Sequence, residues 1–220
     1  MSRKRLTRED SRERTAQRLL AAARKLIAKR GLSDTTLDEI AEEAGYTRGA
    51  FYSNFSSKGD LFIELLRRDH EATSAQLRAL RDDSLPLEHI QQRIREIYSQ
   101  IYRTNDTFMN WTEARMLAAR DAKFQVNLDA LLLERRAEAA ELIEYLYARV
   151  RIAPPLAPTA VAMGVNSLFE GVTLTMLSSP GDMTSDDAES VLTLFVNSLT
   201  RAACTQGEKK PTRGGEGGSP

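Results

Sequence analysis

The ten residues from Tyr46 to Phe55, "YTRGAFYSNF", combine four aromatic rings, one cation and several hydroxyl groups without any acid. On a helix with 100° per residue, Phe51 and Phe55 lie on one side, and Arg48, Gly49, Tyr52 and Ser53 lie on the other. An arginine can bond a guanine edge through two N–H groups or pair with a phosphate, and hydroxyl groups donate to both. A carboxylate on this face would repel phosphates. The outward side therefore has the chemistry that suits a DNA major groove, whereas Phe51 and Phe55 suit a core.

Capping signals around this stretch predict the helices that position it. Thr35 or Thr36 can cap a helix that ends at Gly45, and Thr47 can cap a reading helix that runs to about Phe55. Two helices with a glycine at their corner form a helix-turn-helix. Helix starts at Thr35/Thr36 and at Lys58 offer N–H groups to phosphate. Apolar spacing places one helix before this pair, at 11–30, and a long one after it, from 58 to about 82.

The rest of the chain also has helical periodicity, so the sequence predicts an all-α protein. We expect further helices at about 87–104, 107–119, 122–150, 158–178 and 185–204. The predicted parts are a flexible basic arm (1–10), a helix-turn-helix DNA-binding domain (11–57), a helical body (58–205), and a disordered tail (206–220).

Charge is distributed unevenly along a chain whose net charge is zero. Residues 1–58 contain 13 Lys/Arg and 8 Asp/Glu, whereas residues 59–220 contain 18 and 23. A basic head on an acidic body indicates a charged partner for the head. Cys204 is the one cysteine and the first residues contain no apolar leader, so we expect a cytoplasmic chain without disulfides. Three prolines within 152–169 favour a loop and a buried helix over a membrane span.

The run "TTLDEIAEEAGYTRGAFYSNFSSKGDLFIELL" resembles the N-terminal signature of the TetR family of bacterial transcriptional regulators, and the resemblance covers about residues 12–66. It implies DNA contacts at Thr36, Arg48, Gly49, Tyr52, Asn54 and Lys58. Asn54 replaces the family's more usual histidine or tyrosine and is still expected to donate to a phosphate. Residues and resemblance together predict a DNA-contacting set of Thr35, Thr36, Tyr46, Thr47, Arg48, Gly49, Ala50, Tyr52, Ser53, Asn54 and Lys58.

The body has no motif of comparable specificity, and the resemblance implies that it binds a ligand and dimerises. The last two helices are apolar around much of their circumference, which favours a two-fold dimer face over burial inside one chain. That face is predicted to contain Val161, Val165, Leu168, Val172, Val191, Phe195 and Leu199. Aromatic and apolar side chains of the middle helices suit a cavity for an apolar or aromatic ligand, and plain core is the alternative. The predicted lining is Tyr98, Tyr102, Phe108, Trp111, Met116, Phe124 and Phe169.

Together these features predict a homodimeric, ligand-responsive repressor that binds a near-palindromic DNA operator. A transcriptional activator of the same architecture, or a protein–protein module without DNA binding, is the alternative. An enzyme is disfavoured because His70 and His89 are the only histidines and neither a phosphate-binding loop nor a nucleophile motif is present. We expect no metal, no cofactor and no membrane partner.

Overall fold

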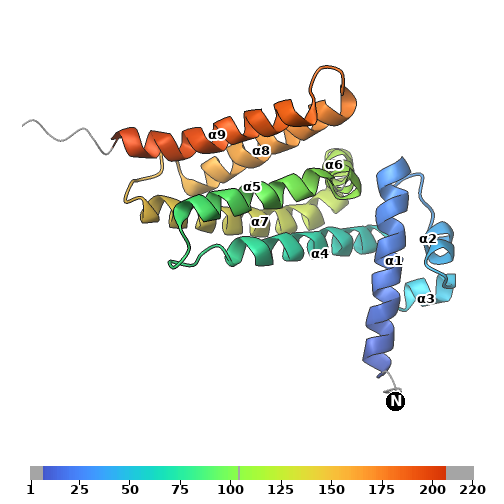
Figure 1. Cartoon of the computed structure of the whole chain (residues 1–220). Helices are drawn as coiled ribbons and strands as arrows, with labels where there is room; N and C mark the ends of the chain where they lie inside the picture. The colour runs from blue at the N-terminus through green and yellow to red at the C-terminus, as the bar shows by residue number, and fades with distance from the viewer. Residues whose placement is uncertain (1–6, 104, 207–220) are drawn as a thin grey trace, which may run out of the picture. The chain divides into compact units, whose positions relative to one another are not determined.

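The computed structural model describes residues 7–103 and 105–206, without the side chains of residues 98–105, 196 and 199–206. The described residues are all-α, as predicted, and contain no strand. Their helices are α1 (Arg8–Arg30), α2 (Leu37–Glu43), α3 (Arg48–Tyr52), α4 (Lys58–Arg78), α5 (Leu87–Arg103), α6 (Asn105–Ala118), α7 (Ala122–Arg149), α8 (Pro158–Ser178) and α9 (Ser185–Gln206) (Figure 1).

Helix α1 begins earlier than predicted. The Thr7 hydroxyl accepts the Asp10 N–H and the Asp10 carboxylate accepts the Thr7 N–H, which is a reciprocal capping box. Residues 8–10 therefore form the first turn of a helix, whereas the sequence placed them in a flexible arm. Residues 1–6 of that arm, and all but residue 206 of the expected tail, lie outside the described residues.

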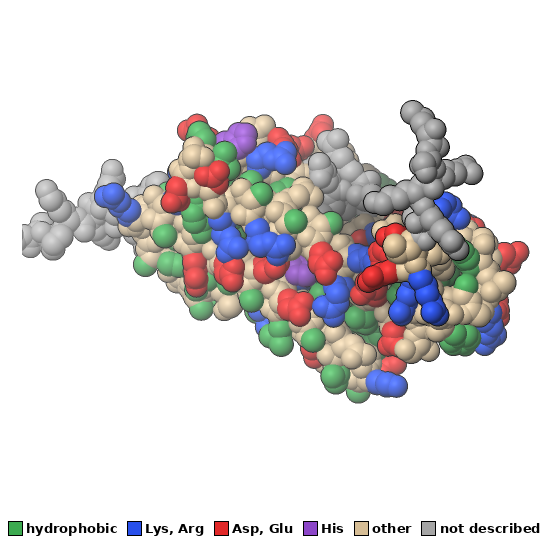
Figure 2. All heavy atoms as spheres, turned by 90° about the horizontal axis from the view of Figure 1, so that it is seen from below, with side chains coloured by type: hydrophobic (Ala, Val, Ile, Leu, Met, Phe, Trp, Pro, Cys, Tyr) green, Lys and Arg blue, Asp and Glu red, His purple; other side chains and the backbone are tan. Residues whose placement is uncertain are grey.

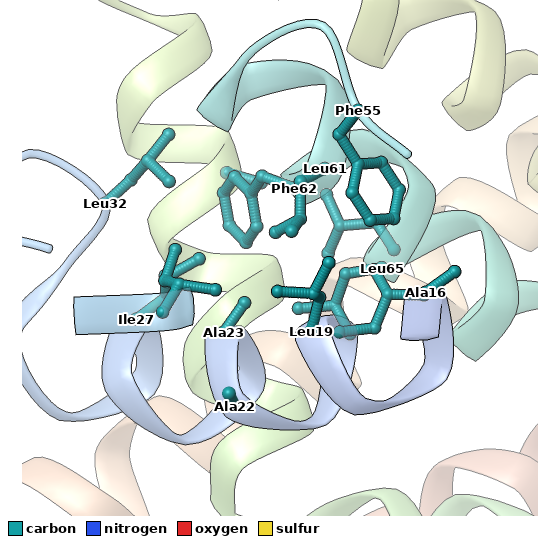
Figure 3. Packing of buried hydrophobic residues seen from close by; sticks show 14 of the residues in the cluster. Ala16, Leu19, Ala22, Ala23, Ile27, Leu32, Phe55, Leu61, Phe62 and Leu65 are labelled. Carbon is teal, nitrogen blue, oxygen red and sulfur yellow. The ribbon is translucent and has the colours of Figure 1, made fainter. Parts of the chain in front are cut away.

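The chain forms two compact units, residues 1–135 and residues 136–220, and α7 passes from one to the other. The predicted domain boundary at residues 57 and 58 lies inside the first unit. Figure 3 shows why: Leu61, Phe62 and Leu65 of α4 pack in the same cluster as Leu19 and Ile27 of α1. The beginning of α4 thus shares its core with the three helices before it, and burial of each such side chain contributes about 1.5–3 kcal/mol.

Local caps fix the corner between α2 and α3. The Thr36 hydroxyl accepts the Glu39 N–H and the Glu39 carboxylate accepts the Thr36 N–H, so Thr36 is the N-cap of α2. At the other end Gly45 has a φ of 75°, its N–H donates to Glu42 O, and the N–H of Tyr46 donates to Ala41 O. This pair of bonds is a Schellman motif, in which a glycine with positive φ ends the helix.

In the second unit α8 and α9 lie side by side and are joined by the short connection at residues 179–184 (Figure 1). By length and composition α8 could cross a membrane, with a mean hydropathy of 1.3 over its most apolar window, of which 28% is buried. One such helix is weak evidence for a span, because a helix that packs against other helices has the same composition.

Candidate nucleic-acid interface

The α3 helix separates a buried and an exposed side as predicted. Phe51 is fully buried and Phe55 is nearly so, and their ring centroids lie 5.8 Å apart. Tyr52 is 50% exposed, and Arg48 is also exposed. Gly49, Ser53 and Thr47 are exposed as well, whereas Tyr46 and Ala50 are half-buried. The predicted outward side therefore exists, and it is held by the aromatic side chains beneath it.

Helix α3 ends at Tyr52, three residues before the predicted end at Phe55. The Ser53 hydroxyl donates to Gly49 O at 3.0 Å, and the Asn54 side-chain amide donates to Ala50 O at 2.8 Å. Such side-chain bonds compete with the helical ladder at a helix end. The Oδ1 atom of Asn54 is buried. The Asn54 amide thus lies against the helix, and its expected donation to a phosphate stays a prediction.

Arg48 has partners on two sides. Its Nη1 donates to Asp38 Oδ2 of α2 at 3.1 Å, and its Nη2 donates to the Tyr52 hydroxyl at 3.3 Å. Its Cζ atom lies 5.6 Å from the centroid of the Tyr52 ring. The hydrogen bond to Tyr52, followed by the nearby charge of Asp38, raises the pKa of Arg48 above its ordinary value. The stretch that lacks acids in sequence thus receives a carboxylate in space, which sequence reasoning missed.

Thr35 and Lys58, which the sequence predicts to contact DNA, make contacts within the fold. Thr35 is fully buried, and its hydroxyl donates to Gly31 O at 2.8 Å. The Lys58 ammonium donates to three carbonyls of the α1–α2 loop, those of Leu32, Ser33 and Thr35. Partial burial lowers the pKa of Lys58. Lys58 therefore fixes the loop that precedes α2, since its three N–H donors match three acceptors.

Helix α6 holds the same loop from another direction. The Glu113 carboxylate accepts the N–H of Leu32 at 2.8 Å and lies against Gly31, whose φ is 81°. On α2, Glu39 also receives a 2.7 Å ion pair from Arg30 at the end of α1. These contacts join residues nine positions apart (Arg30 and Glu39) or 81 positions apart (Leu32 and Glu113), and only the Glu39 capping box has a local sequence signal.

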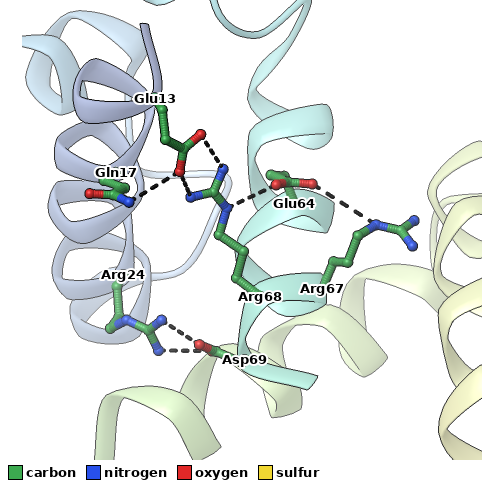
Figure 4. A network of polar contacts seen from close by, with 7 residues as sticks. All are labelled: Glu13, Gln17, Arg24, Glu64, Arg67, Arg68 and Asp69. Atoms are coloured by element: carbon green, nitrogen blue, oxygen red, sulfur yellow. Dashed lines mark hydrogen bonds and ion pairs between the residues drawn. The ribbon is translucent and has the colours of Figure 1, made fainter. Parts of the chain in front are cut away.

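Figure 4 shows a polar network between α1 and α4. Arg68 pairs with Glu13 at 2.6 Å and with Glu64 at 2.9 Å. Arg24 pairs with Asp69, and the same guanidinium donates to Thr107 of α6 at 3.0 Å. Burial raises the pKa of Asp69, although Arg24 opposes that effect. The network fixes α1, and with it the α2–α3 corner, to α4 and α6.

Figure 2 shows how charged side chains are distributed on one face of the molecule. On the face drawn in Figure 2, basic and acidic side chains are interspersed, without one large field of a single sign. Among the described residues there is also no group of three or more His, Cys, Asp or Glu that could hold a metal ion. What distinguishes α3 is its local arrangement of Arg48 and Tyr52 beside the small residues Gly49 and Ser53.

Comparison with known proteins identifies this region. The family model described as "Bacterial regulatory proteins, tetR family" matches residues 19–65, which contain α2, α3 and their supports. Residues 19–65 therefore carry the N-terminal domain of the TetR family. It is 36% identical over 99 residues to the transcriptional regulator TtgR of Pseudomonas putida, a match that covers 44% of this chain and 47% of TtgR. The match thus spans about half the length of that TetR-family relative.

Two longer likenesses extend beyond the family model. The transcriptional repressor AcnR of Corynebacterium diphtheriae is 28% identical over 191 residues, covering 83% of this chain and 90% of AcnR. The solved complex of SmeT with triclosan, in which SmeT is the repressor of a Stenotrophomonas maltophilia efflux pump, has a TM-score of 0.65 at 20% identity. It covers 86% of this chain and 90% of SmeT. The latter likeness shows the fold.

The predicted ligand lining is divided between the two units. Trp111 and Phe124 belong to the core of the first unit, where Phe124 stacks on Phe62 with ring centroids 5.8 Å apart. Met116 is 48% exposed. That these three residues line a ligand cavity stays a prediction, with plain core as the alternative for Trp111 and Phe124. Phe108 is buried in the first unit and Phe169 in the second, while the side chains of Tyr98 and Tyr102 lie outside the described part.

The predicted dimer face also needs correction. Val161 and Val172 are buried within the chain, so neither side chain is available to a second copy. Val165 and Leu168 are half-buried, and Leu199 lies outside the described side chains. Val191 and Phe195 are exposed, as the prediction requires. Three exposed apolar residues were absent from the predicted set, namely Met163, Leu174 and Leu194.

Proposed function

We propose that this chain is a transcriptional regulator that binds double-stranded DNA through α3. The observation that carries the proposal is the α3 arrangement, in which buried Phe51 and Phe55 leave Arg48 and Tyr52 exposed on a helix without an acid of its own. An arginine and small neighbours allow close approach to base edges. The TetR-family match of residues 19–65 and the names of TtgR and AcnR support the same reading.

Salt-dependent binding to duplex DNA tests this proposal. The full chain is equilibrated with a random-sequence duplex pool, bound duplexes are recovered, and the affinity for a recovered duplex is measured at several salt concentrations. We expect a near-palindromic sequence and an affinity that falls steeply with salt, because phosphate contacts release counterions. Recovery of no duplex above background would favour the alternative, a protein–protein module without DNA binding.

We further propose that the regulator acts as a homodimer through α8 and α9. Met163 and Leu174 of α8 are about half exposed, and Val191, Leu194 and Phe195 of α9 are 36–69% exposed. The α9 residues lie at positions i, i+3 and i+4, which places them on one side of the helix. An apolar side of this kind is expected to be covered, and two-fold dimers are the commonest way for a chain to cover it with itself. Two α3 helices must lie about 34–36 Å apart to reach successive major grooves.

The regulator is proposed to be a repressor that a small apolar or aromatic effector releases from DNA. AcnR is named a repressor, and SmeT, a repressor of the same fold, is described in complex with triclosan. The same architecture serves an activator, so a promoter–reporter assay with and without the gene decides between them. Because its proposed partner is chromosomal DNA, we place the protein in the cytoplasm.

A further inference from the structure

We propose that Asp38 is a positioning residue for DNA recognition, which holds the Arg48 guanidinium in one orientation and thereby sets base selectivity. The inference rests on the proposed DNA-binding function. It starts from the contact between Asp38 Oδ2 and Arg48 Nη1 at 3.1 Å, which joins the second residue of α2 to the first residue of α3.

The guanidinium is held from two directions. Asp38 accepts one N–H, and the Tyr52 hydroxyl accepts another from Nη2 at 3.3 Å. A guanidinium has five N–H donors, so three remain for a ligand. Tyr52 is itself fixed by the edge of Phe51, whose ring centroid lies 5.6 Å away. Arg48 is therefore oriented before DNA arrives, while it still has enough donors for a two-bond contact with a guanine edge.

Asp38 lies in the first turn of α2, where a carboxylate interacts favourably with the helix dipole, but neither the stability of the ion pair nor DNA affinity explains its contact with Arg48. The side chains of Arg48 and Asp38 are 59% and 65% exposed, and an ion pair so exposed contributes little to folding. Near phosphates the same carboxylate is repulsive, so it weakens binding to any sequence. What it does provide is orientation. A long, free arginine pairs with whichever phosphate is nearest, whereas one held by Asp38 and Tyr52 loses less freedom when it meets a base.

This account predicts opposite effects of Asp38→Asn on two kinds of binding. Affinity for a scrambled duplex should stay equal or rise, and the slope of log affinity against log salt should steepen by about 0.9, because Arg48 becomes free to neutralise a phosphate. Selectivity, the ratio of affinities for a selected duplex and its single-base variants, should fall about tenfold at one position of each half-site. A merely structural role would lower both affinities together.

Two comparisons isolate the contact. Glu42→Gln removes the same charge from an exposed side chain of α2 that has no described contact with Arg48, and it should leave selectivity unchanged. Arg48→Lys keeps the charge but lacks the planar fork. In that background Asp38→Asn should have no further effect on selectivity, because Asp38 acts through Arg48. Asp38→Ser serves as a second neutral variant if Asp38→Asn unfolds.

The experiment uses the full chain and a duplex that wild-type protein selects from a random pool. The inference is supported by a tenfold loss of selectivity in Asp38→Asn, unchanged selectivity in Glu42→Gln, and no additional loss in the double variant. It is overturned if Asp38→Asn and Asp38→Ser, both folded by thermal denaturation, discriminate single-base variants as wild type does. Failure of wild-type protein to select any duplex is a separate result, and it removes the proposed function together with the inference.

Discussion

At the scale of single residues, the sequence indicates which side chains can do chemistry, and the fold decides which of them are available. Lys58 and Thr35 were expected at the DNA surface on the strength of their type and position. In the structure Lys58 donates to three loop carbonyls and Thr35 is fully buried. The local sequence gives no signal for the hydrogen bonds of Lys58, because the carbonyls that accept them lie 23 to 26 positions away from Lys58.

Replacement of Lys58 tests that internal role. Lys58→Met retains the aliphatic stem but leaves the carbonyls of Leu32, Ser33 and Thr35 without their shared donor. We expect the free energy of unfolding to fall by about 1–3 kcal/mol, the usual result when buried polar groups lose a charged partner. Urea denaturation measures it, with Lys25→Met on the exposed side of α1 as the control. Equal stability of the two variants would show that Lys58 does not hold the loop.

The lowered pKa of Glu39 predicts how its contribution to folding stability depends on pH. Hydrogen bonds from Thr36, aided by Arg30, lower the pKa of Glu39 from 4.5 to about 2 in the folded chain. Since the folded state prefers the ionised form, this contribution to stability is complete above about pH 4.5 and disappears as the pH falls toward 2. The stability difference between wild type and Glu39→Gln should therefore shrink over that range in denaturation series. A difference that stays constant between pH 6 and 2 would contradict this assignment.

At the scale of elements, the local signals predicted most of the helix starts. Thr36 and Thr47 each cap the helix that the sequence assigned to them, and Gly45 ends α2 as predicted. The predicted positions of helix ends without such signals are less accurate. Helix α3 ends at Tyr52 and α4 at Arg78, both earlier than the periodicity indicates. Periodicity continues through a turn, whereas hydrogen bonds such as that from Asn54 to Ala50 O end the helix.

Gly45 and Gly49 are glycines for different reasons: Gly45 for its backbone conformation and Gly49 for close approach of α3 to DNA. Gly45 has a φ of 75°, and an added Cβ would meet nothing within 4 Å, so Gly45→Ala should cost about 1–2 kcal/mol through backbone strain alone. Gly49 is helical, and its Cβ would lie 3.7 Å from Thr47 Oγ1, so Gly49→Ala should be neutral or stabilise by up to about 1 kcal/mol. Thermal denaturation measures both. Gly49→Ala should nevertheless weaken binding to a selected duplex, because its methyl group hinders close approach of α3 to the bases. Unaltered binding would show that α3 does not need a glycine on its exposed side.

At the scale of the whole molecule, helix positions and fold class were predictable from the sequence, but the distribution of burial was not. Val161 and Val172 are as apolar as Leu194, yet they are buried and Leu194 is 69% exposed. A helix that is apolar on most sides does not reveal which side its own chain covers. The candidate ligand site has the same difficulty, because Trp111 and Phe124 have the composition of a pocket and pack in a core.

The exposed side of α9 gives a prediction about assembly. Leu194→Glu places a charge in the proposed dimer face, where burial without a partner is costly, so the protein should sediment as a monomer at micromolar concentration. Val126→Glu is the matched control, since Val126 is 70% exposed on α7 and lies outside the proposed face. It should remain dimeric. A dimer that persists in Leu194→Glu would place the interface elsewhere.

The central claim, that the outward side of α3 recognises DNA, is tested most directly by duplex binding of Arg48→Ala and Tyr52→Ala. Both side chains are exposed, so wild-type stability and assembly are expected for each variant. With a duplex selected by the wild-type chain, we predict at least a tenfold loss of affinity in each variant, in line with the loss of a base contact. Wild-type affinity in both variants, with assembly intact, would contradict the assignment of α3 as the reading helix.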